Sequence, residues 1–202
     1  MPKRKLTKKM GSLYPVSKAL KTLLEESDIL RKKIVLKKKP LLIPNMEINE
    51  VHYMPVGICK AYWIDNEGNE IIFYIYVEDS FVWLPEEFFL NKKSDSYIEA
   101  IADCELYTLT KSQMDLIYTE YPEAMIITNM VRSQMKHFKD VHTRILMKKP
   151  CDRYTLFYSD LNYLWRLNLC DKDVRSFLGI CQKTLTTGKR ELFLKDRRKN
   201  RE

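Results

Sequence analysis

Polar side chains that could contact nucleic acid gather near the C-terminal end of the chain. Residues 169–192 read LCDKDVRSFLGICQKTLTTGKREL, a pattern that predicts two short helices separated at Gly179. The second helix carries six polar residues at helical spacing: Gln182, Lys183, Thr186, Thr187, Lys189 and Arg190. Lysine and arginine neutralise phosphates, whereas glutamine, lysine and threonine can bond base edges in a major groove. The segment therefore predicts either a DNA-reading helix–turn–helix or an ordinary helical hairpin.

The apolar residues of the same segment indicate which side of it is buried. Leu185 and Leu192, seven residues apart, mark the inner side of the second helix, so the six polar residues point away from the core. Asp171 is predicted to be the N-cap of the first helix.

Charge is distributed unevenly along the chain, whose formal net charge is +8. Residues 1–39 hold 13 lysines and arginines against 3 acidic residues, and residues 148–202 hold 14 against 7. Residues 40–121 reverse this, with 15 acidic residues against 4 basic ones. This distribution favours a polyanionic partner, such as nucleic acid, that binds the basic terminal segments and not the acidic centre. Ordinary solvated surface charge is the alternative.

Composition excludes several classes of protein. A chain of 202 residues can form one large domain or two small ones. The longest wholly apolar run, residues 71–77, is too short to cross a bilayer, and the basic start MPKRKLTKKM leads into no secretory signal. Five cysteines without a CxxC pair argue against a disulfide framework or a zinc site. We therefore expect a cytoplasmic protein with no membrane partner.

The elements that must position the C-terminal segment follow from periodicity. Residues 16–36 predict a short amphipathic helix, and residues 40–110 predict an antiparallel sheet. Within the sheet, residues 66–69 form a tight turn in which Gly68 supplies a positive φ, and residues 96–110 form a further strand pair.

A long helix is predicted over residues 122–147, where no glycine interrupts and Pro122 is tolerated in the first turn. Its apolar seam has a mean spacing close to 3.5 and comprises Ile127, Val131, Met135, Phe138, Val141 and Ile145. This spacing favours a dimer interface. Packing of the helix on the chain's own sheet is the alternative.

The order of these elements resembles that of the Crp/Fnr transcription regulators. Residues 51–70 read VHYMPVGICKAYWIDNEGNE and residues 97–110 read YIEAIADCELYTLT, which look like the family's hairpin and strand pair. Residues 153–168 read RYTLFYSDLNYLWRLN and residues 173–192 read DVRSFLGICQKTLTTGKREL, which look like its DNA-binding region. The resemblance covers about residues 18–194 and implies a β-roll, a dimer helix, a hinge and a helix–turn–helix.

Three departures from the family bear on DNA reading. Thr186 and Thr187 stand where the family carries Ser-Arg, Gly188 replaces an apolar residue, and Cys181 replaces a capping hydroxyl. The resemblance thus implies DNA binding, but not the family's sequence preference.

The resemblance also implies an effector pocket, for which we name Trp83, Leu84, Ser94, Asp95 and Tyr97. Trp83-Leu84 stands where nucleotide-binding members have Gly-Glu for the ribose, and Ser94-Asp95 stands where they have Arg-Ser/Thr for the phosphate. Losing the cation and gaining an acid would repel a buried phosphate, so cyclic AMP is excluded. Two alternatives remain: the β-roll binds another small molecule, or its interior is filled by side chains and it binds no ligand.

The sequence therefore predicts an α+β protein. We expect an N-terminal antiparallel β-roll (a double-stranded β-helix or jelly-roll) sensor domain over 1–121, a dimerisation helix over 122–148, and a winged-helix-like helix–turn–helix domain over 149–202. The expected function is sequence-specific regulation of transcription by a homodimer that binds double-stranded DNA and a small-molecule effector, with no enzymatic activity, cofactor or metal. The alternative is a signalling or scaffold dimer whose degenerate helix–turn–helix does not bind DNA.

Overall fold

The computed structural model describes residues 2–167 and 169–199. The chain divides into two compact units. The first unit combines Met1–Trp63 with Ile75–Lys136, and the second combines Ile64–Tyr74 with His137–Glu202. No helix in the described part of the chain is long and apolar enough to span a membrane.

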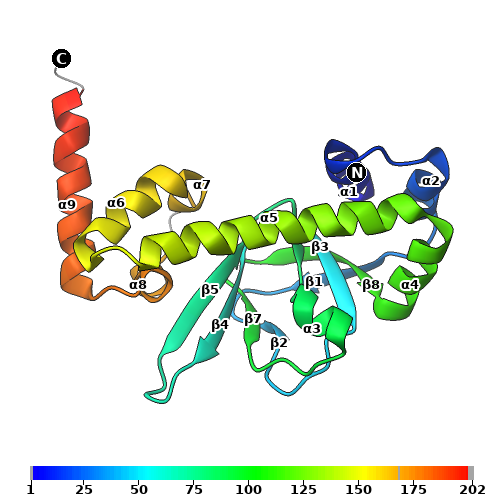
Figure 1. The fold of residues 1–202 in the computed structure, drawn as a ribbon, viewed down its shortest axis with the longest axis horizontal. Helices are drawn as coiled ribbons and strands as arrows, with labels where there is room; N and C mark the ends of the chain where they lie inside the picture. Colours follow the sequence, from blue (N-terminus) through cyan, green and yellow to red (C-terminus); the bar gives the residue numbers. More distant parts are fainter. Residues whose placement is uncertain (1, 168, 200–202) are drawn as a thin grey trace. The chain divides into compact units, whose positions relative to one another are not determined.

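The N-terminal two thirds of the chain hold all the strands that the structure describes (Figure 1). In chain order the elements are α1 (Pro2–Leu13), α2 (Lys18–Glu26), β1 (Arg31–Val35), β2 (Pro40–Leu42), β3 (Glu50–Val56), β4 (Cys59–Ile64), β5 (Glu70–Tyr76), β6 (Ser80–Val82), α3 (Pro85–Leu90), β7 (Tyr97–Ala100), β8 (Cys104–Thr110), α4 (Lys111–Glu120) and α5 (Pro122–Leu146). The remaining elements are α6 (Pro150–Asp160), α7 (Asn162–Trp165), α8 (Asp171–Leu178) and α9 (Gln182–Lys199).

The strands form two four-stranded sheets, in the orders β1-β8-β3-β6 and β2-β7-β4-β5. The pairs β1–β8, β2–β7, β3–β6, β3–β8 and β4–β7 are antiparallel, which confirms the predicted antiparallel sheet structure. Residues 96–110 do supply two strands, but β7 and β8 belong to different sheets, because the chain crosses over at residues 101–103. Strand β3 is buried on both faces, since Val51 through Pro55 are all buried and Tyr53 packs in a core with α1 and α2.

The predicted turn between β4 and β5 is confirmed. Gly68 adopts φ +83°, and the Asp65 carboxylate accepts hydrogen bonds from the backbone N–H groups of Glu67 and Asn69 at 2.9 and 2.8 Å. These two bonds between a side chain and the backbone hold the tip of the hairpin.

The N-terminal region contains more helix than the sequence predicted. α1 covers the basic start of the chain, and Leu6 and Met10, one turn apart, bury its inner side. α2 ends at Glu26, short of the predicted limit at residue 36, and Ser17 caps it by accepting from the N–H of Leu20 at 3.2 Å. The lysine-rich sequence concealed α1, because only Leu6, Met10 and Leu13 reveal its amphipathic side.

Helix α5 is confirmed over Pro122–Leu146, but its apolar seam faces this chain's own core. Five of the six seam residues are buried within the single chain: Ile127, Val131, Met135, Phe138 and Ile145. Ile127 belongs to the core formed with α1 and α2, and the Phe138 ring lies 4.5 Å from the Tyr74 ring. These five side chains are thus covered by their own chain, as the alternative to the predicted dimer seam requires.

The exposed side of α5 carries apolar residues that the sequence analysis did not select. Met125, Ile126 and Met130 are 37%, 40% and 39% exposed. Ile126 and Met130 are four residues apart and so lie one above the other on the helix surface. We call these three residues the exposed α5 face.

The described residues of 149–199 form helices alone, which corrects the winged-helix-like part of the prediction. A wing needs a tight turn between two strands, and residues 188–199 contain no glycine or proline after Gly188. α9 instead continues as one helix to Lys199.

His52 on β3 should make the first unit lose stability in mild acid. Its side chain is 7% exposed, and its Nδ1 lies 2.8 Å from the Thr108 hydroxyl. Burial, followed by the charges of Lys33 and Arg31, lowers its pKa to about 3. The Glu50 carboxylate lies 3.9 Å from Nε2 and would act in the opposite direction, but it is already paired with the Arg31 guanidinium, so burial prevails.

The unfolded chain protonates this histidine near pH 6.5, whereas the folded chain does not until about pH 3. Between these limits the unfolded state binds more protons, so stability falls as the pH falls, by about 1.4 kcal/mol per pH unit from this residue alone. Urea unfolding of the wild type and of His52→Gln between pH 7 and 4 measures the difference. The variant should show the shallower decline, while substitution of the exposed His137 by Gln should not change it. Equal slopes for His52→Gln and the wild type would contradict the prediction.

Candidate nucleic-acid interface

A sharp turn joins α8 to α9, as the sequence predicted. Gly179 ends α8 in the left-handed conformation with φ +56°, which glycine adopts without strain. Arg153 on α6 secures the turn from outside, since its Nη1 donates to the carbonyls of Leu178 and Gly179 at 3.0 and 2.8 Å. The guanidinium thus satisfies carbonyl groups that the end of a helix leaves without partners.

Rings from α5 and α6 pack against Phe177 of α8. The Phe177 ring lies parallel to the His142 imidazole at 3.8 Å, and edge-on to Phe157 at 6.0 Å. The His142 Nε2 donates to the Phe177 carbonyl at 2.6 Å, and burial lowers the pKa of this histidine. His142 is thus a buried residue of α5. A neutral imidazole fits this buried position, because it can both stack on the Phe177 ring and donate a hydrogen bond to the Phe177 carbonyl.

All six residues predicted to contact DNA are exposed on α9. Their buried counterparts on the same helix are Leu185, Gly188 and Leu192. The hydroxyls of Thr186 and Thr187 donate to the carbonyls one turn earlier, each at 3.0 Å. The helix therefore presents a polar side whose threonines can still accept hydrogen bonds.

Asp171 is the first residue of α8 and pairs with the polar side of α9. The N-cap is Cys170, which corrects the predicted capping role of Asp171. The Asp171 carboxylate lies 2.5 Å from the Lys189 ammonium and 3.5 Å from the Gln182 amide nitrogen. The bond to Lys189 is the main cause that lowers the pKa of this carboxyl group. In the free protein, the Asp171 carboxylate therefore binds two of the side chains that are predicted to contact DNA.

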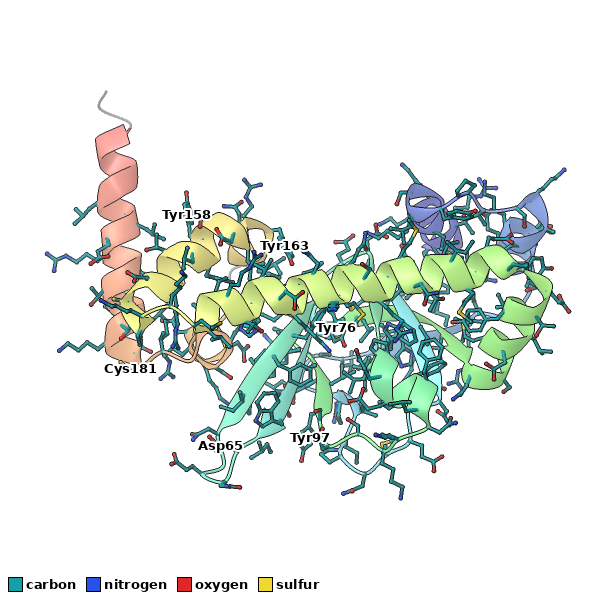
Figure 2. All side chains as sticks on the ribbon, viewed as in Figure 1. Asp65, Tyr76, Tyr97, Tyr158, Tyr163 and Cys181 are labelled. Carbon is teal, nitrogen blue, oxygen red and sulfur yellow. The ribbon has the colours of Figure 1, made fainter. Side chains whose placement is uncertain are left out.

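Cys181 stands at the start of α9 (Figure 2). Its sulfur lies 3.3 Å from the Thr184 hydroxyl, and this bond, with further bonds to backbone N–H groups, lowers the pKa of the thiol. A sulfur therefore takes the place of the hydroxyl cap that the family pattern supplies, so the beginning of the helix is not left uncapped.

Helix α9 packs on α6 (Figure 1), and Gly188 lies at this contact, against Tyr154. A Cβ atom at this position would lie 2.8 Å from Cδ1 and 2.9 Å from Cβ of Tyr154. These distances are shorter than carbon atoms in contact allow. The glycine that breaks the family pattern is thus a packing requirement of the two helices.

The first residues of β5 also contact α8, a contact that sequence reasoning missed. The Ser176 hydroxyl donates to the Glu70 carbonyl and accepts from the N–H of Ile72 at 3.0 Å. Lys172, one turn earlier on α8, lies 2.6 Å from the Glu70 carboxylate. We call this contact the hairpin clasp. The spacing of Lys172 and Ser176 placed both on one side of α8, but nothing local indicated that the distant hairpin covers that side.

The residues named for an effector pocket lie in different surroundings. Ser94 is buried, but its hydroxyl bonds the backbone of Ser96, donating at 3.1 Å and accepting at 3.0 Å. Asp95 is exposed, and Tyr97 stacks on Tyr62 at 4.9 Å between ring centroids.

Leu84 is buried and precedes α3, whereas Trp83 borders two small cavities. Of the five named residues, Trp83 thus lines a cavity, whereas the Ser94 hydroxyl is already bonded within its own turn.

No protein-family model matches the chain, and no curated protein matches its sequence. Solved structures do match. FixK2 from Bradyrhizobium japonicum is similar with a TM-score of 0.68 and 15% identity, over 83% of this chain and 86% of that one. A regulator of the Crp/Fnr family from Eubacterium rectale gives 0.67 and 18%, over 89% and 85%. A CooA mutant from Carboxydothermus hydrogenoformans gives 0.62 and 15%, over 84% and 82%.

Proposed function

Since the chain has the Crp/Fnr fold, we propose that it is a transcription regulator that binds double-stranded DNA as a homodimer. The polar side of α9 enters the major groove, with Gln182, Lys183, Thr186 and Thr187 reaching base edges. Lys189 and Arg190 contact phosphates. The observation that carries this proposal is the exposure of all six side chains on a helix whose turn and underside are firmly anchored.

The place of Gly188 supports DNA binding over a degenerate helix–turn–helix. A glycine in a decayed recognition helix would be free of constraint, whereas this one lies against Tyr154 with no room for a methyl group. Packing explains the departure from the family pattern, so it no longer favours a scaffold protein.

The second copy is proposed to pack on the exposed α5 face. Helix–turn–helix dimers place two recognition helices on half-sites about 34 Å apart, so two chains must associate through a surface outside the reading helix. Met125, Ile126 and Met130 offer an apolar surface on a helix of 25 residues, and burial of such surface is favourable.

Asp171 should act as an internal competitor of the DNA. Its carboxylate holds Lys189 in the free protein, so a phosphate must displace it before Lys189 can bind. Asp171→Asn removes the competing charge and should raise the affinity for all DNA sequences several-fold, because the exposed pair is weak and the freed lysine adds one phosphate contact.

The test is a salt titration of binding to genomic DNA fragments. Lys189→Ala and Arg190→Ala should each lower affinity for every sequence and reduce the slope of log K against log salt by about 0.9. Gln182→Ala, Lys183→Ala and Thr186→Ala should instead weaken discrimination at particular base pairs, by about 1–3 kcal/mol where the contact is bidentate.

Lys92→Ala is the matched control, because Lys92 is an exposed residue of the first unit. This substitution removes the same charge as Lys189→Ala does. It should leave the salt slope unchanged. If α9 variants and Lys92→Ala behave alike, α9 does not contact DNA. If no fragment binds at any salt concentration, the chain is the scaffold dimer instead.

A further inference from the structure

A cavity of about 60 Å³ lies inside the first unit. Side chains of α1, α2, α4 and the first half of α5 close it on one side, and β3, β6 and β8 close it on the other. One water needs about 10–15 Å³, so the space exceeds what a single solvent molecule fills. Ile127, Thr128 and Val131 of α5 form part of its wall, on the helix that also carries the exposed α5 face.

The wall is uncharged, and most of its polar side-chain atoms are already satisfied. The Tyr53 hydroxyl donates to Asp79, and the Tyr107 hydroxyl donates to Glu105 at 2.9 Å. The Thr128 hydroxyl lies 3.1 Å from that of Tyr118. These groups have no need of a ligand, and an empty apolar cavity would stay dry.

One polar wall residue differs. Trp83 is 2% exposed, and its Nε1 has no hydrogen-bond partner in the described part of the chain. A buried N–H without a partner is costly, and a ligand that supplies an acceptor removes that cost. The indole also borders a second, more polar cavity beside His52, so the test must show which side its N–H serves.

We propose that this cavity is the effector site, and that the effector is a small, neutral, largely apolar molecule with one hydrogen-bond acceptor that bonds Trp83. This deepens the proposed function and rests on it. An uncharged wall rejects a phosphate or a carboxylate, because burying an unpaired charge is far costlier than burying a carbonyl. The ligand acts where α5 is packed against the sheet, so it can bias the helix that joins the two copies.

Two small probes of nearly equal shape separate the two parts of the proposal. Acetone carries a carbonyl, and 2-methylpropene replaces it with a methylene group. Both are smaller than benzene, which occupies a cavity of about 150 Å³ in another protein. Calorimetry should show saturable one-to-one binding of both, with acetone about tenfold tighter, which is the value of one neutral hydrogen bond. Trp83→Phe should abolish that tenfold preference while keeping binding of 2-methylpropene.

Filling the cavity provides the second variant. Ala124 is 4% exposed and lines the cavity, so Ala124→Leu should remove binding of both probes. Ala19→Leu adds the same atoms to an exposed position of α2 and should leave binding unchanged. Thermal unfolding of each variant shows whether it is folded. If Ala124→Leu does not fold, the Trp83→Phe comparison decides alone.

Acetone should also change the affinity for DNA at least fivefold, measured on the full chain. Binding of neither probe, or binding that survives in Ala124→Leu, overturns the site. Equal affinity of the two probes for the wild type overturns the role of Trp83. Saturable binding with unchanged DNA affinity overturns the effector role, and loss of DNA binding with intact probe binding would instead contradict the proposed function. Cyclic AMP serves as the negative control and should give no saturable heat.

Discussion

The double variant Ile126→Glu/Met130→Glu should sediment as a monomer at concentrations where the wild type sediments as a dimer. The two side chains are 40% and 39% exposed in the single chain, so carboxylates there remain solvated and the fold is retained. Facing the same residues of a second copy, four negative charges in an apolar interface would oppose association. Binding to a palindromic DNA site should fall at least about a hundredfold, because each monomer then binds one half-site without the other.

Leu116→Glu on α4 is the matched control. Leu116 is 63% exposed, so the variant introduces the same charge at an apolar surface position outside the exposed α5 face. It should sediment and bind DNA as the wild type does. If the double variant remains a dimer, the second copy packs elsewhere. If both variants are monomers, the effect is not specific to α5.

Gly188→Ala should destabilise the second unit, although alanine normally stabilises a helix by about 1 kcal/mol relative to glycine. The new methyl group would lie 2.8 Å from the Tyr154 ring, so α9 or α6 must shift. Overpacking of this kind costs about 1–3 kcal/mol, which exceeds the gain in helix propensity. Denaturant unfolding measures the sign, and DNA binding should weaken in parallel because α9 moves.

Gly11→Ala provides the comparison in the same chain. Gly11 lies in α1, and no atom lies within 4 Å of its missing Cβ, so this substitution should stabilise the first unit by about 1 kcal/mol. Adding Tyr154→Leu to Gly188→Ala should restore part of the lost stability by making room. A stabilising Gly188→Ala would show that the helices do not require the glycine.

The elements predicted well are those whose signals are local. The β4–β5 turn follows from Gly68 and its neighbours, and α5 follows from an unbroken helical stretch after Pro122. The turn at Gly179 and the exposed side of α9 likewise follow from spacing alone.

The predictions that needed correction depend on contacts between distant segments. The spacing of Ile127 and Val131 identified a buried stripe on α5, but could not show that the chain itself covers it. His142 looked like any polar residue on a helix until Phe177, 35 residues later, stacked on it. The cavity beside Trp83 is closed by α1, whose lysine-rich sequence concealed its helix.

The hairpin clasp means that the second unit is not a contiguous segment of sequence. Glu70 and Ile72 come from strand β5, and His142 comes from α5. A recombination joint at residue 149, where the sequence places a hinge, would separate Ser176 and Phe177 from these partners. Chimaeras that graft only residues 149–202 onto another sensor would thus inherit the reading helix without its scaffold, and exchange of this module requires the hairpin and the end of α5 to travel with it.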